Sequence, residues 1–292
     1  GMMPSYGLVS RYGVVAMGSS FDTIGVLGNN VEDAGLFFDI TAGKDPMDAT
    51  TVERAPSYDL ANLDRSLKGK KIGIIKEYMA EGIDSGVKQT ILGTVELMKK
   101  AGAEVTEISM PLADLALPCY YVLVPAEVSS NLARYDGIRF GHSSTKAQTL
   151  QESYLLSRNE GFGVEAKRRI LIGTYLLSSG YYDAYYKKAQ KVRTLIIDDF
   201  KQAFTKVDLL VGPAAPMPAF KLGERSKNPV QMYLADFCTV AVNLAGSCGI
   251  SVPAGMVDGL PVGLQMIGPQ QGETALLGAA RAVEVLLAEA VL

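Results

Sequence analysis

Lys71-Ile72-Gly73-Ile74-Ile75 is a short apolar run that follows a turn rich in Lys and Gly, and it has the length and composition of a buried strand. Apolar residues then recur at one-face spacing from Val87 to Met98, which predicts a helix that ends near Gly102. The alternating pattern of residues 104–110 predicts a second strand. This strand, helix and strand favour a parallel pair with a right-handed crossover, inside an α/β domain.

The C-terminal part of the sequence continues the pattern. Residues 249–253 and 261–267 read as two strands on either side of an Asp258-Gly259 turn, so we expect a β-hairpin there. We expect Thr274 to cap a closing helix that runs to about Ala290.

The middle of the chain is richer in helix. Residues 164–204 form helices in our interpretation, with a break near Ser178-Ser179-Gly180 and a second helix from about Tyr182. Residues 208–211 read as a buried strand that ends at Gly212-Pro213. Helices that alternate with short apolar strands predict an α/β layered fold with a sheet covered on both faces. We expect a single domain over residues 2–292.

Composition limits the classes of function. The chain has 292 residues, of which 48% are hydrophobic, enough for a large core. Its 28 Lys and Arg against 31 Asp and Glu give a net charge of −3, so no overall basic field indicates nucleic-acid binding. Three cysteines without CxxC or metal-ligand spacing fit a reducing compartment, and we expect a cytoplasmic protein. No apolar run approaches the ~20 residues of a membrane helix, so we expect no membrane association.

The residue types that carry chemistry give few candidates. A serine nucleophile needs a base within hydrogen-bond reach, and none of the paired serines has a recognisable elbow, so we read them as turn or capping residues: Ser19-Ser20, Ser129-Ser130, Ser143-Ser144 and Ser178-Ser179. The single histidine, His142, has neither a second histidine nor an adjacent carboxylate in the sequence, which argues against a metal site or a catalytic dyad. We therefore expect no catalytic residue and no metal site in this chain.

Three stretches carry a resemblance that spans residues 4 to 290. They lie at 118–141, at 160–193 with Tyr182-Asp183-Ala184-Tyr185-Tyr186 at its centre, and at 232–253. These stretches resemble the amidase-signature family and, within it, the glutaminase components of the tRNA-dependent amidotransferases that act on Glu-tRNA(Gln) and Asp-tRNA(Asn). Residues 4–34 resemble the segment that directly follows the catalytic region of that family, and the Gly/Ser-rich and Lys-bearing segments of its Ser-Ser-Lys triad do not occur in the sequence.

The resemblance implies an α/β/α sandwich around a mixed sheet, of which this chain supplies roughly the last two thirds as an N-terminally truncated form. In the family, the glutaminase component hydrolyses glutamine, and a second component, the B subunit, uses ATP and Mg²⁺ to amidate the mischarged tRNA for protein biosynthesis. We expect this chain to carry the glutamine-binding portion, to be inactive alone and to hold no cofactor itself.

Glutamine presents an α-carboxylate and an α-ammonium group, so a site for it needs a guanidinium and a carboxylate. Resemblance to the family motifs places the guanidinium at Arg169 and the carboxylate at Asp236. Tyr120 is the expected pocket wall and hydrogen-bond donor near the substrate amide.

The same resemblance implies the amidotransferase B and C subunits as partners, with tRNA reached through the complex. We also expect a homodimer of the truncated chain that pairs around residues 14–17, because uncovered sheet edges and apolar faces tend to find partners. Lys187, Lys188, Lys191 and Arg193 lie at helical spacing and read as a solvated face. Two alternatives remain: a fragment of an amide hydrolase that acts alone, and a binding or scaffolding module without catalysis.

Overall fold

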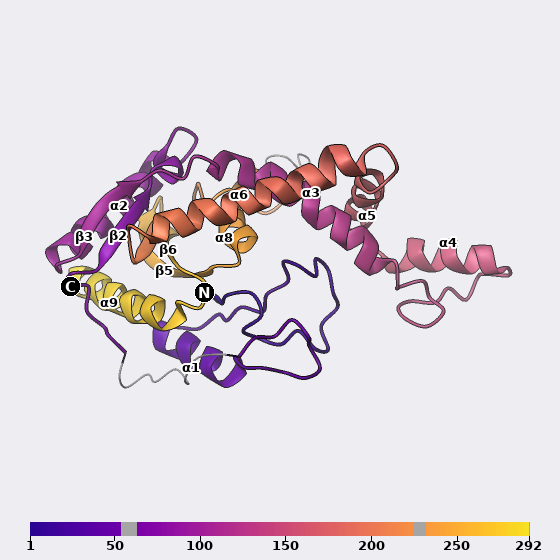
Figure 1. Cartoon of the computed structure of the whole chain (residues 1–292), viewed down its shortest axis with the longest axis horizontal. Helices are drawn as coiled ribbons and strands as arrows, with labels where there is room; N and C mark the ends of the chain where they lie inside the picture. The colour runs from indigo at the N-terminus through magenta and orange to yellow at the C-terminus, as the bar shows by residue number, and fades with distance from the viewer. Residues whose placement is uncertain (54–62, 225–231, 292) are drawn as a thin grey trace. The chain divides into compact units, whose positions relative to one another are not determined.

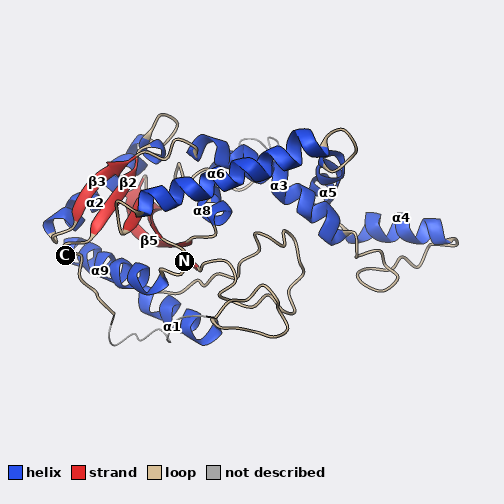
Figure 2. Cartoon of the chain, viewed as in Figure 1, coloured by secondary structure: helices blue, strands red, loops and turns tan. Residues whose placement is uncertain are grey.

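The computed structural model describes residues 1–53, 63–224 and 232–291 (Figure 1). The chain forms two compact units. The first contains Gly1–Tyr12, Thr23–Leu117 and Arg193–Leu292, and the second contains Gly13–Asp22 and Pro118–Val192. The strands lie within the residue ranges of the first unit, whereas Figure 2 draws α4 and α5, which belong to the second, as helices. The expectation of a single domain stays a prediction.

The first unit is built on a six-stranded mixed sheet with the order β1-β5-β6-β4-β2-β3. The strands are β1 (Met2–Met3), β2 (Lys71–Ile75), β3 (Glu104–Ile108), β4 (Leu209–Pro213), β5 (Cys248–Val257) and β6 (Leu260–Gly268). β2 pairs in parallel with both β3 and β4, while β6 runs antiparallel to β4 and β5. The predicted parallel crossover is confirmed, and so is the mixed α/β fold.

Helices α2 and α9 pack against each other and against the hairpin of β5 and β6. The helices of this unit are α1 (Val31–Thr41), α2 (Ser85–Lys100), α8 (Val240–Ala245) and α9 (Glu273–Val291), with short 3₁₀ turns η1 (Glu77–Met79) and η3 (Leu234–Asp236). A Cβ on Gly268, opposite Cys248, would meet Leu276 of α9, whereas a Cβ on Gly249 would meet Val242 of α8. Because successive strand residues point to opposite faces, α8 and α9 cover opposite faces of β5.

The hairpin between β5 and β6 follows from its two turn residues. Asp258 has φ 51° and Gly259 has φ 76°, the paired left-handed conformations that a two-residue turn between antiparallel strands requires. Met256 and Val257 therefore lie opposite Pro261 and Leu260, so the predicted hairpin is confirmed, with strands that reach closer to the turn than predicted. The helix of residues 85–100 begins where Asp84 accepts hydrogen bonds from the backbone of Gly86 and Val87.

The core of the first unit lies between the sheet and its helices. Its fully buried members come from the central strands and from the inner faces of α2 and α9: Ile72, Ile75, Ile91, Met98, Leu209, Leu210, Leu264, Ile267, Leu276 and Leu277. At about 25 cal/mol per Å² of apolar surface removed from water, these side chains supply the main stabilisation of the sheet region.

The second unit is made of helices and one clamped loop. Its helices are α4 (Leu150–Gly161), α5 (Val164–Leu176), the single π turn η2 (Tyr182–Tyr186), and parts of α3 (Ala113–Leu132) and α6 (Lys187–Phe204). The loop of residues 13–22 is fixed to α3, because the Glu127 carboxylate accepts hydrogen bonds from the backbone and hydroxyl of Ser20 at 2.9 and 2.5 Å. Asn131 donates to the carbonyl of Met17 and to the hydroxyl of Ser19.

One local prediction needs correction, and another is confirmed with a different type of helical turn. The closing helix begins at Glu273, so Thr274 lies inside it and is not its cap. The buried carboxylate of Glu273 instead accepts a hydrogen bond from the backbone of Ser5 at 2.8 Å. The helical stretch expected from Tyr182 does begin there, but as a π turn that passes into α6 at Lys187.

Candidate functional site

Tyr120 and Arg169 come together in the second unit. Tyr120 lies on α3 and Arg169 on α5, and these two helices approach closely at Gly173, where an added Cβ would collide with the backbone oxygen of Pro125. Arg169 lies one turn before Gly173 on the same helix, so the close approach holds its guanidinium beside the side chain of Tyr120.

Neighbouring side chains stabilise the positive charge of Arg169. Its Nε donates to Glu165 Oε1 at 3.0 Å, one turn earlier on α5, and its side chain keeps only 22% of its surface exposed. Burial disfavours the charge, but the Glu165 carboxylate and the Tyr120 hydroxyl outweigh that effect and raise the pKa of Arg169 above its ordinary value. A half-buried, permanently charged guanidinium beside a phenol can bind a carboxylate.

Aromatic rings surround Tyr120. The ring of Phe21, from the clamped loop, meets it edge to face at a centroid distance of 6.3 Å, and Tyr121 meets it at 5.1 Å. Such edge-to-face pairs add about 0.5–1.5 kcal/mol beyond the area that they bury. Tyr120 is itself half-buried, so its ring is fixed from two sides while its hydroxyl interacts with Arg169.

Asp236 belongs to the first unit, at the end of the 3₁₀ turn η3. It is exposed, and its backbone carbonyl accepts hydrogen bonds from the amide and the hydroxyl of Thr239 at 3.0 and 3.1 Å. Its neighbour Phe237 packs edge to face on Tyr78, with 5.6 Å between ring centroids. The structure therefore brings Tyr120 and Arg169 together within one unit and places Asp236 in the other.

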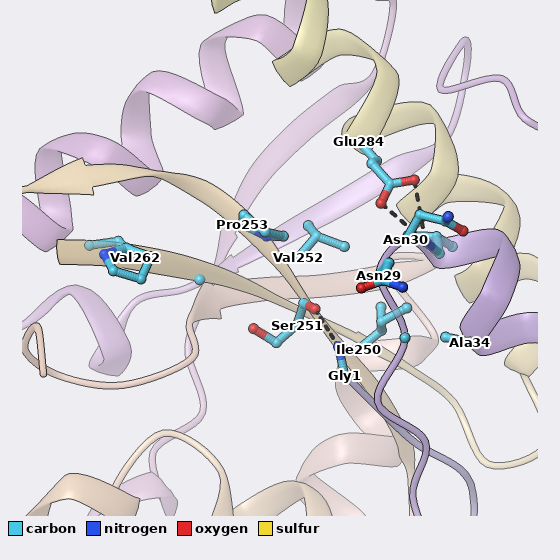
Figure 3. A pocket seen from close by; sticks show the side chains of 14 residues that line it. Gly1, Asn29, Asn30, Ala34, Ile250, Ser251, Val252, Pro253, Val262 and Glu284 are labelled. Atoms are coloured by element: carbon cyan, nitrogen blue, oxygen red, sulfur yellow. Dashed lines mark hydrogen bonds between the residues drawn. The ribbon is translucent and has the colours of Figure 1, made fainter.

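A cavity of about 310 Å³ opens in the first unit, between the hairpin strands and the start of α1 (Figure 3). Some of its polar groups make contacts within the chain: the Glu284 carboxylate accepts from the backbone of Val31, and the ammonium group of Gly1 donates to the carbonyl of Ser251 at 3.0 Å. None of the three residues predicted to bind glutamine lines this cavity.

The paired serines make local hydrogen bonds. Ser129 and Ser178 donate to backbone carbonyls three residues earlier, which is the structural role predicted from the sequence. Ser19 and Ser20 are exceptions, because their partners Asn131 and Glu127 lie 112 and 107 residues away. His142 also has a partner that the sequence spacing hid: its Nε2 lies 2.8 Å from Glu160 Oε2, across an exposed loop.

Neither a metal centre nor a membrane span is found in the described part of the chain. Within residues 1–53, 63–224 and 232–291, no group of three or more His, Cys, Asp or Glu side chains is arranged to hold a metal ion. No helix in these same ranges is long and apolar enough to cross a membrane.

Sequence reasoning missed contacts of Arg169 and of Arg193. Glu165 lies four positions before Arg169, and this spacing is a recognised signal for a helical ion pair. Arg193 was assigned to a solvated face, but its Nε donates to the carbonyl of Leu244 at 3.0 Å, at the end of α8. That contact joins residues 51 positions apart, so no local pattern could have revealed it.

Comparison with known proteins assigns the chain to a family. The family model described as Amidase matches residues 1–277, and the chain belongs to this amidase family. Two curated relatives are both A subunits of glutamyl-tRNA(Gln) amidotransferases. The one from Thermoanaerobacter pseudethanolicus is 52% identical over 97% of this chain and 58% of its own length, and the one from Koribacter versatilis is 52% identical over 99% and 60%.

Solved structures agree with the fold. The crystal structure of the glutamyl-tRNA(Gln) amidotransferase A subunit from Thermotoga maritima superposes with a TM-score of 0.79 at 38% identity, over 97% of this chain and 57% of that one. A bacterial aryl acylamidase of the amidase-signature family superposes with a TM-score of 0.73 at 20% identity, over 98% and 58%, which shows a shared fold only. The chain thus spans somewhat more than half the length of the relatives that it matches.

Proposed function

We propose that this chain carries the glutamine-binding portion of the A subunit, the glutaminase component, of a tRNA-dependent amidotransferase. The observation that supports this most is the 52% identity with such proteins over nearly the whole chain, compared with 20% for the aryl acylamidase. The difference favours the tRNA-dependent class over an amide hydrolase that acts alone.

In this proposal, Arg169 receives the α-carboxylate of glutamine. Its planar guanidinium can donate two parallel hydrogen bonds to a carboxylate, and its raised pKa keeps it charged. Tyr120 stands beside it, within reach of a ligand bound to Arg169, and contributes a hydroxyl to the same polar site. Asp236 receives the α-ammonium group.

The catalytic step lies outside the role proposed for this chain. The sequence contains no Gly/Ser-rich segment of the kind that carries the family's Ser-Ser-Lys triad, so we propose that the chain alone does not hydrolyse glutamine. We further propose that it assembles with the B and C subunits of the amidotransferase, that ATP and Mg²⁺ act on the B subunit, and that tRNA is reached through the complex.

Calorimetric titration with L-glutamine tests the binding role. We expect weak binding by the parent chain and a loss in Arg169→Ala and Asp236→Ala. Removing one charged hydrogen-bond partner costs about 1.5–3 kcal/mol, which is about a 10- to 150-fold weaker affinity. Arg139→Ala, at an exposed position of the same unit as Arg169, is the matched control and should bind like the parent. Unchanged affinity in either test variant would reject the role assigned to that residue.

A further inference from the structure

The turn that carries Asp236 is short. η3 is a three-residue 3₁₀ turn, closed by a hydrogen bond of 3.3 Å from the amide of Phe237 to the carbonyl of Leu234. Short 3₁₀ turns have poor hydrogen-bond geometry and are seldom stable by themselves. Contacts from other elements therefore contribute to the position of Asp236.

One such contact comes from the middle of the sheet. Gln265 lies on β6, where it is paired with Gly212 of β4 on one side and Ser251 of β5 on the other. Its side chain is buried, and its Nε2 donates to the carbonyl of Cys238 at 2.7 Å. The amide of Gln265 is thus fixed inside the six-stranded sheet and binds the backbone two residues after Asp236.

Two further contacts complete the support of this segment. The ring of Tyr78, which is almost fully buried, packs on Phe237, and Arg193 binds the last turn of α8 at the carbonyl of Leu244. Thr239 donates from its amide and its hydroxyl to the carbonyl of Asp236, within the segment itself. The ring contact is apolar and the Arg193 contact lies eight residues from Asp236, whereas the hydrogen bond from Gln265 to Cys238 ties the backbone next to Asp236 to the sheet.

We propose that Gln265 is a positioning residue, which orients the Asp236 carboxylate toward the α-ammonium group of glutamine by anchoring the turn at Cys238. This inference rests on the proposed function for what Asp236 binds. The anchoring itself does not depend on any ligand, so the two can be tested apart.

The test variant is Gln265→Met, which keeps the length and volume of the side chain but removes its donor. Leu264→Met, at the neighbouring and fully buried position of β6, is the matched control for a change in the core of the same strand. Gln265→Ala serves as a second variant if the methionine packs in another rotamer.

Hydrogen exchange of the ligand-free 292-residue chain is the first measurement. We expect Gln265→Met to speed the exchange of the amides of Phe237 and Thr239 about tenfold or more, with little change in the strands and no effect from Leu264→Met. Equal protection of these two amides in parent and variant would overturn the anchoring role, whether or not glutamine binds.

Titration with two ligands then separates positioning from general destabilisation. L-glutamine should bind Gln265→Met about tenfold more weakly than the parent. Glutaramate, which is glutamine without the α-amine, should bind the parent and Gln265→Met with equal affinity. In a chain that already carries Asp236→Ala, Gln265→Met should cause no further loss of affinity for glutamine. An equal loss for both ligands would mean a merely structural role and would overturn the inference. If Asp236→Ala binds glutamine like the parent, the assignment of Asp236 fails and the role of Gln265 toward the ligand fails with it, while the exchange result still reports on the anchor.

Discussion

Arg169 binds its own helix with one edge of the guanidinium. Its Nε donates to Glu165, so the terminal nitrogens, beside the Tyr120 hydroxyl, are the donors suited to a ligand carboxylate. Glu165 also pairs with Arg168, so one carboxylate orders two neighbouring guanidinium groups. What distinguishes the two is burial, since the side chain of Arg168 is 40% exposed and that of Arg169 is 22% exposed.

The first prediction concerns this guanidinium. We expect Arg169→Lys to keep the positive charge yet lose most of the affinity for L-glutamine, because an ammonium group cannot form the planar two-bond pair with a carboxylate. Calorimetric titration measures the effect. Arg168→Lys, on the same helix and with the same partner Glu165, should bind like the parent. Equal behaviour of the two variants would mean that only the local charge matters.

A second prediction concerns the pH dependence of the loop at His142. The hydrogen bond between His142 and Glu160 is the main cause that lowers the pKa of the Glu160 carboxyl. The hydrogen bond from Lys146 lowers this pKa further. A carboxyl with a lowered folded pKa contributes stability above its unfolded pKa, and loses it as the pH falls through the folded value. We therefore expect Glu160→Gln to speed exchange of the Ser144 amide near neutral pH, and to match the parent well below the ordinary pKa of 4.5. The same difference at both pH values would contradict an ionic cause.

Among the elements, some could be predicted from the sequence for clear physical reasons. The hairpin at Asp258-Gly259 and the amphipathic helix of residues 85–100 follow from local turn chemistry and from apolar spacing. α3 could not be predicted in this way, because Pro118 and Pro125 lie inside it and proline is rare in helix interiors. Packing of buried residues such as Leu123 and Val128 outweighs the local cost.

The candidate site was predicted from family motifs and not from spacing, because its residues come from distant segments. Tyr120 and Arg169 lie 49 positions apart, on helices that meet only through tertiary packing. The contact from Gln265 to Cys238 also joins distant positions, 27 residues apart, and leaves no local signal.

A third prediction tests the packing of α3 on α5. Gly173→Ala forces a methyl group into the backbone of Pro125, and overpacking of this kind costs about 1–3 kcal/mol. We expect a lower midpoint of urea unfolding and weaker glutamine binding, because Arg169 lies one turn away. Gly93→Ala, in an exposed part of α2 with open space around it, should instead stabilise the protein by about 0.5–1 kcal/mol. A higher urea midpoint for Gly173→Ala than for the parent would contradict the close packing of α3 on α5 at this position.

At the scale of the whole molecule, the prediction of a homodimer concerns exposed apolar residues. Val14 and Val15, at 54% and 52% exposure, follow one another in the loop of residues 13–22. We expect a homodimer in which this loop is covered, and a monomer for the Val14→Asp, Val15→Asp double variant, as measured by analytical ultracentrifugation. Leu222→Asp, at another exposed apolar position, is the control. A monomeric parent at high concentration would contradict this expectation.

Catalysis is also a property of the whole molecule. We expect no release of ammonia from glutamine by the purified chain, because a serine nucleophile without its base is unreactive. A coupled ammonia assay measures this. Activity above the buffer background, abolished by substitution of a serine within residues 1–292, would show that the chain contains a nucleophile of its own.

The most direct test of glutamine recognition removes charged groups from both ligand and protein. Glutaramate lacks the α-amine that we assign to Asp236, and 4-aminobutanamide lacks the α-carboxylate that we assign to Arg169. In calorimetric titrations, we predict that Asp236→Ala no longer distinguishes glutamine from glutaramate, and that Arg169→Ala no longer distinguishes glutamine from 4-aminobutanamide. The parent should prefer glutamine in both pairs. If each variant keeps the full preference of the parent, this chain does not recognise glutamine through these two residues.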